Sequence, residues 1–131
     1  MTKAEKLRAL LNGAETILAP CAFDALSARC IEIAGFPMVG TTGFGIHGAY
    51  LGTPDNGLLT FNEMLSACTQ MAEAVGIPVM ADAEGGYGNA VNTYRTVREF
   101  EKAGLSGLFI EDQKLPPNCP FFKKTPGEIS I

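Results

Sequence analysis

Two groups of carboxylates stand where apolar, strand-like runs of this sequence end. Asp82 and Glu84 follow the apolar residues 78–81 and precede a glycine-rich stretch, and Glu111 closes a second apolar run at residues 107–110. A buried strand that ends in carboxylates gives up apolar surface and gathers negative charges that repel one another. Such an arrangement is useful where a cation or a reaction requires it. The two groups therefore predict a cation-binding or catalytic site.

The segments around these groups alternate between strands and helices. Strands that are apolar throughout are predicted at residues 16–20, 37–41, 78–82 and 107–111. Helices are predicted over residues 2–12, 24–34, 60–75 and 89–103, each stopped by a glycine or by the next strand. Capping boxes are expected at Thr2 with Glu5 and at Thr60 with Glu63, and the other predicted caps are Asp24 and either Asn89 or Asn92. Apolar strands that alternate with amphipathic helices indicate a parallel sheet covered by helices.

Apolar stripes predict which face each helix buries. The inward residues are expected to be Met64, Leu65, Cys68, Met71 and Val75 in one helix, Leu26, Cys30 and Ile33 in another, and Val91, Tyr94, Val97 and Phe100 in a third. Residues 42–59 are rich in glycine and are predicted to form a long loop. His47 is the only histidine of the chain and lies in this loop. We expect it to be solvated.

Two α/β architectures are compatible with this pattern, a doubly wound sheet and a (β/α)8 barrel, and both place sites at the carboxyl ends of strands. Residues 85–88 do not complete a GxGxxG dinucleotide fingerprint, which favours the barrel. A full barrel needs about 250 residues, whereas this chain has 131. The expectation is one domain over residues 1–131: the N-terminal half of a barrel, with a preceding helix, four parallel strands and a truncated last unit. It would be a fragment, a truncated gene product or a unit that another chain completes.

Composition restricts the classes of partner. A net charge of −4 makes nucleic acid and anionic membranes unsuitable ligands. No apolar run reaches the roughly 20 residues of a membrane span, and the N-terminus lacks the apolar stretch of a signal peptide. The four cysteines show neither metal-ligand spacing nor a dense disulfide pattern. A reduced, cytoplasmic protein is the simplest interpretation.

Four ordered motifs resemble those of the isocitrate lyase / phosphoenolpyruvate mutase superfamily. They are residues 40–44, 51–55, 82–89 with 110–113, and 94–100. Within it, the chain is most similar to the branch of methylisocitrate lyase, dimethylmalate lyase and carboxyphosphonoenolpyruvate mutase. The similarity spans nearly the whole chain. It implies the N-terminal half of a Mg²⁺-dependent barrel whose helix-swapped oligomers break or form bonds beside a 2-oxo or 2-hydroxy acid, and therefore a homo-oligomer that binds a small carboxylic acid.

The resemblance also implies a metal site. Mg²⁺, or Mn²⁺ in its place, is expected on Asp82, with Asp55, Glu84 and Glu111 around it, partly through water. Mg²⁺ prefers about six hard oxygen ligands and keeps several waters, which suits such a set. The family has Asp at the position of Glu84, so the side chain here is one methylene longer. We expect metal binding to survive with a shifted water shell.

The substrate carboxylate is expected at the segment after the second strand. Thr42 and Gly43 match the Ser-Gly of the family, where a hydroxyl and backbone N–H groups hold that carboxylate, and Phe44 is placed with them. Asp82 would act on the substrate through the metal. A plain tight turn at Thr42 and Gly43 is the simpler alternative.

The segment at residues 116–122 departs from the family pattern. Cys119 falls on the cysteine that serves as proton donor in lyases of this type, and with Glu111 it is the candidate catalytic residue. Pro117 replaces a lysine that would lower the pKa of the thiol. Pro120 and Phe121 replace a Gly-His pair, and Asn118 is one position away from the Lys-x-Asn of mutases. An ordinary loop cysteine is the alternative.

Three functions follow from these residues. The first is a Mg²⁺-dependent carbon–carbon lyase that resembles methylisocitrate lyase and releases pyruvate or a related 2-oxo acid, with little activity in the 131-residue chain alone. The second keeps the metal but makes the enzyme a phosphonopyruvate- or phosphoenolpyruvate-mutase type, a hydrolase or an oxaloacetate decarboxylase. The third is a half-barrel without catalysis that serves assembly or binding.

Overall fold

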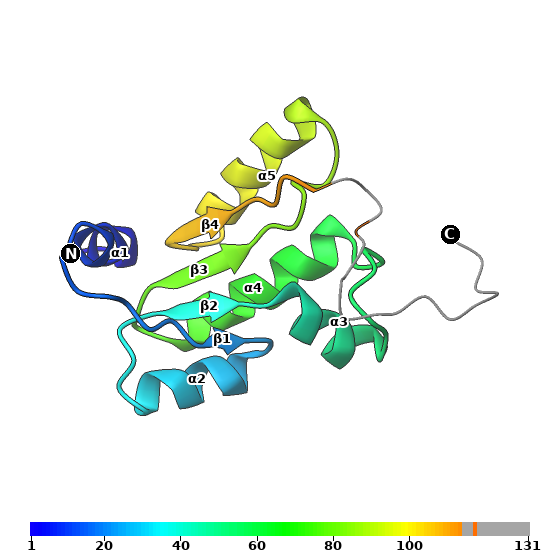
Figure 1. The fold of residues 1–131 in the computed structure, drawn as a ribbon. Helices are drawn as coiled ribbons and strands as arrows, with labels where there is room; N and C mark the ends of the chain where they lie inside the picture. The colour runs from blue at the N-terminus through cyan, green and yellow to red at the C-terminus, as the bar shows by residue number, and fades with distance from the viewer. Residues whose placement is uncertain (114–116, 118–131) are drawn as a thin grey trace.

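Four parallel strands form one sheet in the order β1-β2-β3-β4 in the computed structural model, which describes residues 1–113 and 117 (Figure 1). The strands are β1 (Cys21–Ala22), β2 (Val39–Thr41), β3 (Val79–Asp82) and β4 (Gly107–Phe109). The helices are α1 (Lys3–Leu11), α2 (Ala25–Ile33), α3 (Gly43–Leu51), α4 (Phe61–Ala74) and α5 (Ala90–Lys102). Among these, no helix is long and apolar enough to cross a membrane.

The connections between strands identify the architecture. Helix α2 packs against α4, and α4 against α5, so the three helices form one layer over one face of the sheet. Neighbouring parallel strands joined in sequence order by helices on a single face are typical of a (β/α)8 barrel, whereas a doubly wound sheet carries helices on both faces. The fold is therefore α/β and part of such a barrel, as predicted. Helix α1 lies at the end of the sheet where the strands begin (Figure 1).

Helix starts follow the predicted local chemistry. Capping boxes are present at Thr2 with Glu5, Asp24 with Ser27, Thr60 with Glu63, and Asn89 with Asn92. Each one satisfies backbone N–H groups that the first helical turn leaves without partners. Asn89, rather than Asn92, is the cap of α5. Gly104 follows α5 with φ +85°, a conformation that glycine adopts without strain.

The core lies between the sheet and the helix layer. Val79 and Ala81 of β3 are buried, whereas the alternate residues Met80 and Asp82 are half-buried on the other face. The predicted inward stripe of α4 is confirmed: its buried residues Met64, Cys68 and Met71, together with Val75, belong to the core, and Leu65 packs against it.

The predicted strand boundaries were partly wrong. The first strand is not at residues 16–20 but at Cys21–Ala22, and Leu18 is 68% exposed. Pro20 has no N–H to donate, so regular pairing begins after it, although its carbonyl still accepts from Gly40. The fourth strand ends at Phe109 instead of Glu111.

Two predicted helix faces were also wrong. Leu26 and Ile33 of α2 are 72% and 76% exposed, because α2 buries Ala28, whose small side chain permits close packing. In α5 only Phe100 of the predicted stripe is buried. The residues of α2 and α5 that point outward against prediction are Leu26, Cys30, Ile33, Val91, Tyr94 and Val97. The hydroxyl of Thr96, which donates to Gly86 O at 3.0 Å, helps to set the inward face of α5.

The segment 42–59 is not one long loop. Helix α3 occupies Gly43–Leu51, and Thr42 caps it by accepting the Gly45 N–H at 3.2 Å. Close packing explains one of the glycines that suggested a loop, since a Cβ on Gly45 would lie 2.8 Å from Thr42 Cγ2 and 2.9 Å from Phe23 Cβ. Helix α3 stands where strands β2 and β3 end (Figure 1).

Candidate functional site

Asp82 is the most firmly held carboxylate at this end of the sheet. Its Oδ2 accepts the Gly43 N–H at 3.0 Å, and its Oδ1 accepts the Glu84 N–H at 3.0 Å. Its own N–H donates to the Thr41 hydroxyl of the neighbouring strand at 2.8 Å. Two backbone N–H groups therefore hold the side chain of Asp82, and a third hydrogen bond holds its backbone. Sequence reasoning missed Thr41, and the signal available was a second hydroxyl residue directly before Thr42.

Glu84 is forced close to other acidic groups. Burial raises the pKa of its carboxyl to about 8, and the charges of Asp82, Asp55 and Glu111 add to the rise. The pKa of Glu111 is raised by burial and by Asp82, although the bond from Gln113 opposes it. The four residues predicted around the metal are thus close enough for the charge of one to raise the pKa of another. Their roles as ligands stay a prediction.

The backbone around Glu84 is held in an uncommon conformation. Glu84 has φ +50° and Tyr87 φ +61°, a region that side-chain-bearing residues rarely adopt. Two hydrogen bonds hold the turn: Glu84 N–H donates to Asp82 Oδ1, and Glu84 O accepts the Glu111 N–H at 2.7 Å. The loops after β3 and β4 are therefore joined directly through Glu84.

Two carboxylate oxygens of the site lack hydrogen bonds. Asp55 Oδ1 and Glu84 Oε1 are buried and have no hydrogen-bond partner among the described residues. Burial raises the pKa of Asp55, His47 opposes the rise, and Asp82 adds to it. Buried carboxyl oxygens without hydrogen-bond partners are costly, and hard oxygens from several loops are the ligands that Mg²⁺ and Mn²⁺ prefer. The residues present fit a divalent cation of this kind.

His47 is not solvated, and that prediction was wrong. The ring is fully buried, because α3 carries it under the loop that leads to α4. Its Nδ1 lies 2.9 Å from Gly43 O and 3.4 Å from Asp55 Oδ1, and its Nε2 accepts the Leu59 N–H at 3.2 Å. Atoms of His47, Asp55 and Glu84 that could bind a metal lie within 4.8 Å of one another.

The predicted substrate segment lies beside these carboxylates. The Thr42 hydroxyl and the Gly43 N–H are both engaged, by the Gly45 N–H and by Asp82 respectively. Gly43 has no space for a side chain, since a Cβ there would overlap Glu84 Oε1 and lie 3.1 Å from Asp82 Oδ2. Phe44 is 54% exposed. Whether Thr42, Gly43 and Phe44 bind a substrate carboxylate stays a prediction.

The segment with the candidate proton donor is described only in part. Cys119, Asn118 and Pro120 lie outside the described residues. Pro117 lies against the loop that carries Asp55, since a Cβ on Gly57 would be 2.8 Å from Pro117 Cδ. This contact brings the start of the departing segment close to the acidic site.

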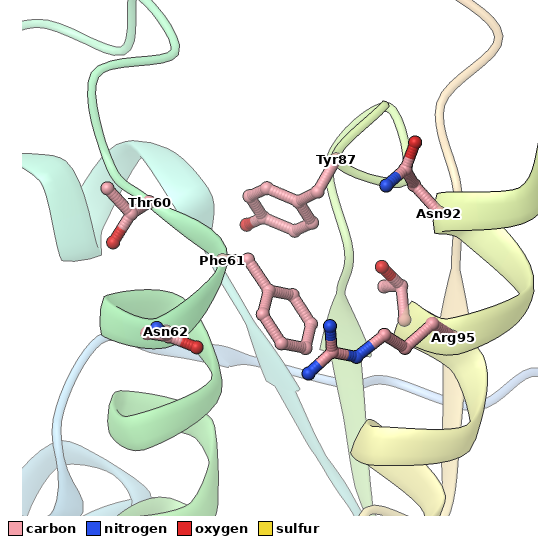
Figure 2. Close-up of a pocket in the computed structure, with 7 residues that line it drawn as sticks. Thr60, Phe61, Asn62, Tyr87, Asn92 and Arg95 are labelled. Carbon is pink, nitrogen blue, oxygen red and sulfur yellow. The ribbon is translucent and has the colours of Figure 1, made fainter. Parts of the chain in front are cut away.

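A hollow of about 270 Å³ lies at the start of α4 and α5 (Figure 2). It is lined by Thr60, Phe61, Asn62, Tyr87, Asn92, Arg95 and Thr96. Tyr87 connects it to the acidic loop: its ring packs edge-on against Phe61 at 5.5 Å, and its hydroxyl is buried without a hydrogen-bond partner among the described residues. None of the residues that line this hollow is acidic.

Comparison with known proteins finds one family along most of the chain. The family model described as phosphoenolpyruvate phosphomutase matches residues 7–125. A 2,3-dimethylmalate lyase of Eubacterium barkeri is 48% identical over 119 residues, which cover 91% of this chain and 41% of the relative. An oxaloacetate decarboxylase of Rhodopseudomonas palustris (strain BisB18) is 42% identical over 131 residues, with 99% and 44% covered.

Solved structures agree with the sequence relatives. A phosphoenolpyruvate phosphomutase from Streptomyces platensis subsp. rosaceus superposes with a TM-score of 0.85 at 41% identity, covering 92% of this chain and 42% of that one. A phosphonopyruvate hydrolase in complex with oxalate and Mg²⁺ has a TM-score of 0.85 at 36% identity, with 90% and 41% covered. The chain thus spans about two fifths of the length of the relatives it matches.

Proposed function

Because this chain belongs to the phosphoenolpyruvate phosphomutase family, within the isocitrate lyase superfamily, we propose that it carries the metal-binding part of a carbon–carbon lyase. The substrate would be a 2-hydroxy- or 2-oxo-dicarboxylate, of the kind that methylisocitrate lyase and dimethylmalate lyase cleave, and the product pyruvate or a related 2-oxo acid. The cofactor would be Mg²⁺, with Mn²⁺ as a substitute.

One observation carries this proposal: buried carboxylate oxygens without donors surround a carboxylate that is held in place. Asp55 Oδ1 and Glu84 Oε1 have no hydrogen-bond partner among the described residues, and Asp82 is fixed by Gly43, Glu84 and Thr41. A set of acids used only for structure would be expected to pair with N–H groups or cationic side chains. Carboxyl oxygens without such partners favour a bound cation.

Each residue would have a defined part in the reaction. Asp82 would hold the metal, with Asp55, Glu84 and Glu111 around it, in part through water. Bound Mg²⁺ would supply a Lewis acid that stabilises negative charge developing on the substrate oxygen. Thr42 and Gly43 would orient the substrate carboxylate beside Phe44, and Cys119 would donate the proton, with Glu111 as the second catalytic group.

A decarboxylase is the second candidate, because several of the relatives are named oxaloacetate decarboxylase and are 42% to 44% identical to this chain. This activity would use the same metal and the same carboxylates. It would differ in the bond that breaks, and therefore in the groups that contact the distal end of the substrate. Assaying pyruvate release from 2,3-dimethylmalate and from oxaloacetate would separate the two.

The test of the metal site needs only the 131-residue chain. Saturating Mg²⁺ or Mn²⁺ should raise its Tm by mass action. Asp82→Asn should remove the rise, because the amide loses the charge at the centre of the site. Leu7→Ala, a core substitution in α1, should lower the Tm but keep the rise. Oxalate should bind, by calorimetry, only when Mg²⁺ is present. Binding of oxalate that is equal with and without Mg²⁺ would contradict the proposal.

A further inference from the structure

His47 has a partner at each ring nitrogen, and one of these partners determines the tautomer. The Leu59 N–H points at Nε2 from 3.2 Å, and a backbone N–H can only donate. Nε2 must therefore accept, so the proton of the neutral ring resides on Nδ1. This Nδ1–H donates to Gly43 O at 2.9 Å.

The same Nδ1–H faces the acidic site. It lies 3.4 Å from Asp55 Oδ1, which has no hydrogen-bond partner among the described residues. Gly43, whose carbonyl it binds, donates its own N–H to Asp82 Oδ2. His47 thus connects the turn that holds Asp82 to the loop that carries Asp55.

His47 resembles a metal ligand by distance alone. One of its ring nitrogens and one carboxylate oxygen each of Asp55 and Glu84 lie within 4.8 Å of one another. A ligand nitrogen needs a free lone pair, however, and neither nitrogen has one available: Nε2 accepts from Leu59 and Nδ1 carries the proton. The geometry therefore makes His47 a neighbour of the ligands rather than one of them.

We propose that His47 is a positioning residue of the metal site, and this inference rests on the proposed function. Its Nδ1–H holds the Gly43 turn and presents a partial positive charge to Asp55, so that this carboxylate stays directed at Glu84 and Asp82. A neutral donor suits this place because a permanently cationic side chain would compete with the metal for the same oxygens. The full burial of the ring keeps it in one orientation.

The first test is nitrogen NMR of the unmodified chain. His47 is the only histidine, so both ring nitrogen signals come from this residue, and their couplings to the carbon-bound ring protons distinguish Nδ1 from Nε2. We expect Nδ1 to show the chemical shift of a protonated nitrogen and Nε2 that of an unprotonated one, both before and after addition of Mg²⁺. The opposite tautomer, or a metal bond at either nitrogen, would overturn the proposal.

The second test compares two substitutions by calorimetric Mg²⁺ titration. His47→Asn keeps an N–H donor near the position of Nδ1, whereas His47→Gln keeps an acceptor that can reach Leu59. Loss of groups that orient metal ligands typically weakens metal binding about 10–100-fold. The His47→Gln variant should therefore bind Mg²⁺ at least about tenfold more weakly than the His47→Asn variant. Leu7→Ala controls for a general loss of stability.

The outcomes separate the two proposals. Equal Mg²⁺ affinities of the Asn and Gln variants would overturn the role of His47 while the metal site stands. Absence of Mg²⁺ binding in the unmodified chain would overturn the proposed function, and the positioning role with it. If both variants fail to fold, the NMR result on the unmodified chain decides.

Discussion

Charged side chains are hydrogen-bonded at one end of the sheet, whereas at the other end some buried carboxyl oxygens have no hydrogen-bond partner among the described residues. At the amino end, the Lys3 ammonium donates to Ala72 O at 2.5 Å and to Val75 O at 2.6 Å, at the end of α4. Glu32 there accepts the Gly76 N–H at 2.6 Å. At the carboxyl end, buried oxygens of Asp55 and Glu84 have no hydrogen-bond partner among the described residues.

The difference separates charges that stabilise the fold from charges that destabilise it. Lys3 meets the unpaired carbonyls and the negative end of a helix dipole, which is favourable. The carboxylates repel one another, and burial adds to the penalty. Residues that lower the stability of the fold and make no compensating structural contact are typical of functional sites. Three substitutions test this contrast.

The largest effect is expected from Gly43→Ala at the carboxyl end. The new Cβ would overlap Glu84 Oε1 and crowd Asp82 Oδ2, so both carboxylates must move. Displaced ligands typically weaken metal affinity about 10–100-fold, and a calorimetric Mg²⁺ titration should show this loss.

The matched control for Gly43→Ala is Gly48→Ala in the same helix. A Cβ on Gly48 would have no heavy atom within 4 Å. This variant should keep its Mg²⁺ affinity and gain up to about 1 kcal/mol in the free energy of unfolding, because alanine favours a helix. An equal loss of affinity in both variants would contradict the proposed crowding at Gly43.

An intermediate effect is expected on the pH dependence of stability. The pKa of Glu84 rises from 4.5 to about 8 on folding, so the folded chain keeps a proton that the unfolded chain releases between these values. The stabilisation is complete below the unfolded value and is lost as pH rises through the folded one. Without metal, the Tm should therefore fall from about pH 5 to about pH 8.

Glu84→Gln should flatten this fall and raise the Tm near pH 8, while it weakens Mg²⁺ binding. Glu99→Gln is the control, since Glu99 belongs to an ion pair with Lys102 on α5, away from the acidic site. It should leave the fall in place. If the Tm of the Glu84→Gln variant depended on pH as the Tm of the unmodified chain does, the fall would not come from a raised pKa of Glu84.

The smallest effect is expected at the amino end. Lys3→Met removes two charged hydrogen bonds and should lower the free energy of unfolding by about 1–2 kcal/mol, measured by urea denaturation. Its Mg²⁺ affinity should not change. Lys6→Met, at an exposed position of α1, should alter neither quantity. A change of Mg²⁺ affinity in Lys3→Met would contradict the proposal that only the carboxyl end of the sheet binds metal.

Short-range chemistry explains what could be predicted. Capping boxes join residues three apart, so Thr2 with Glu5 and Thr60 with Glu63 were visible in the sequence and are present. Asp82 does end a parallel strand, and the inward stripe of α4 follows from helical periodicity. The convergence of Asp82, Glu84 and Glu111 was accessible because parallel strands bring their carboxyl ends to one edge.

Only the tertiary structure decided the rest. The inward faces of α2 and α5 depend on contacts such as Ala28 in the core and Thr96 with Gly86, ten residues apart. His47 was predicted to be solvated because glycines surround it in the sequence. Its burial depends on Gly43, Asp55 and Leu59, which meet only when α3 folds back against the strand ends. Local sequence determines where a helix with a capping box begins, whereas the partners of a buried polar group come from segments that the fold alone brings together.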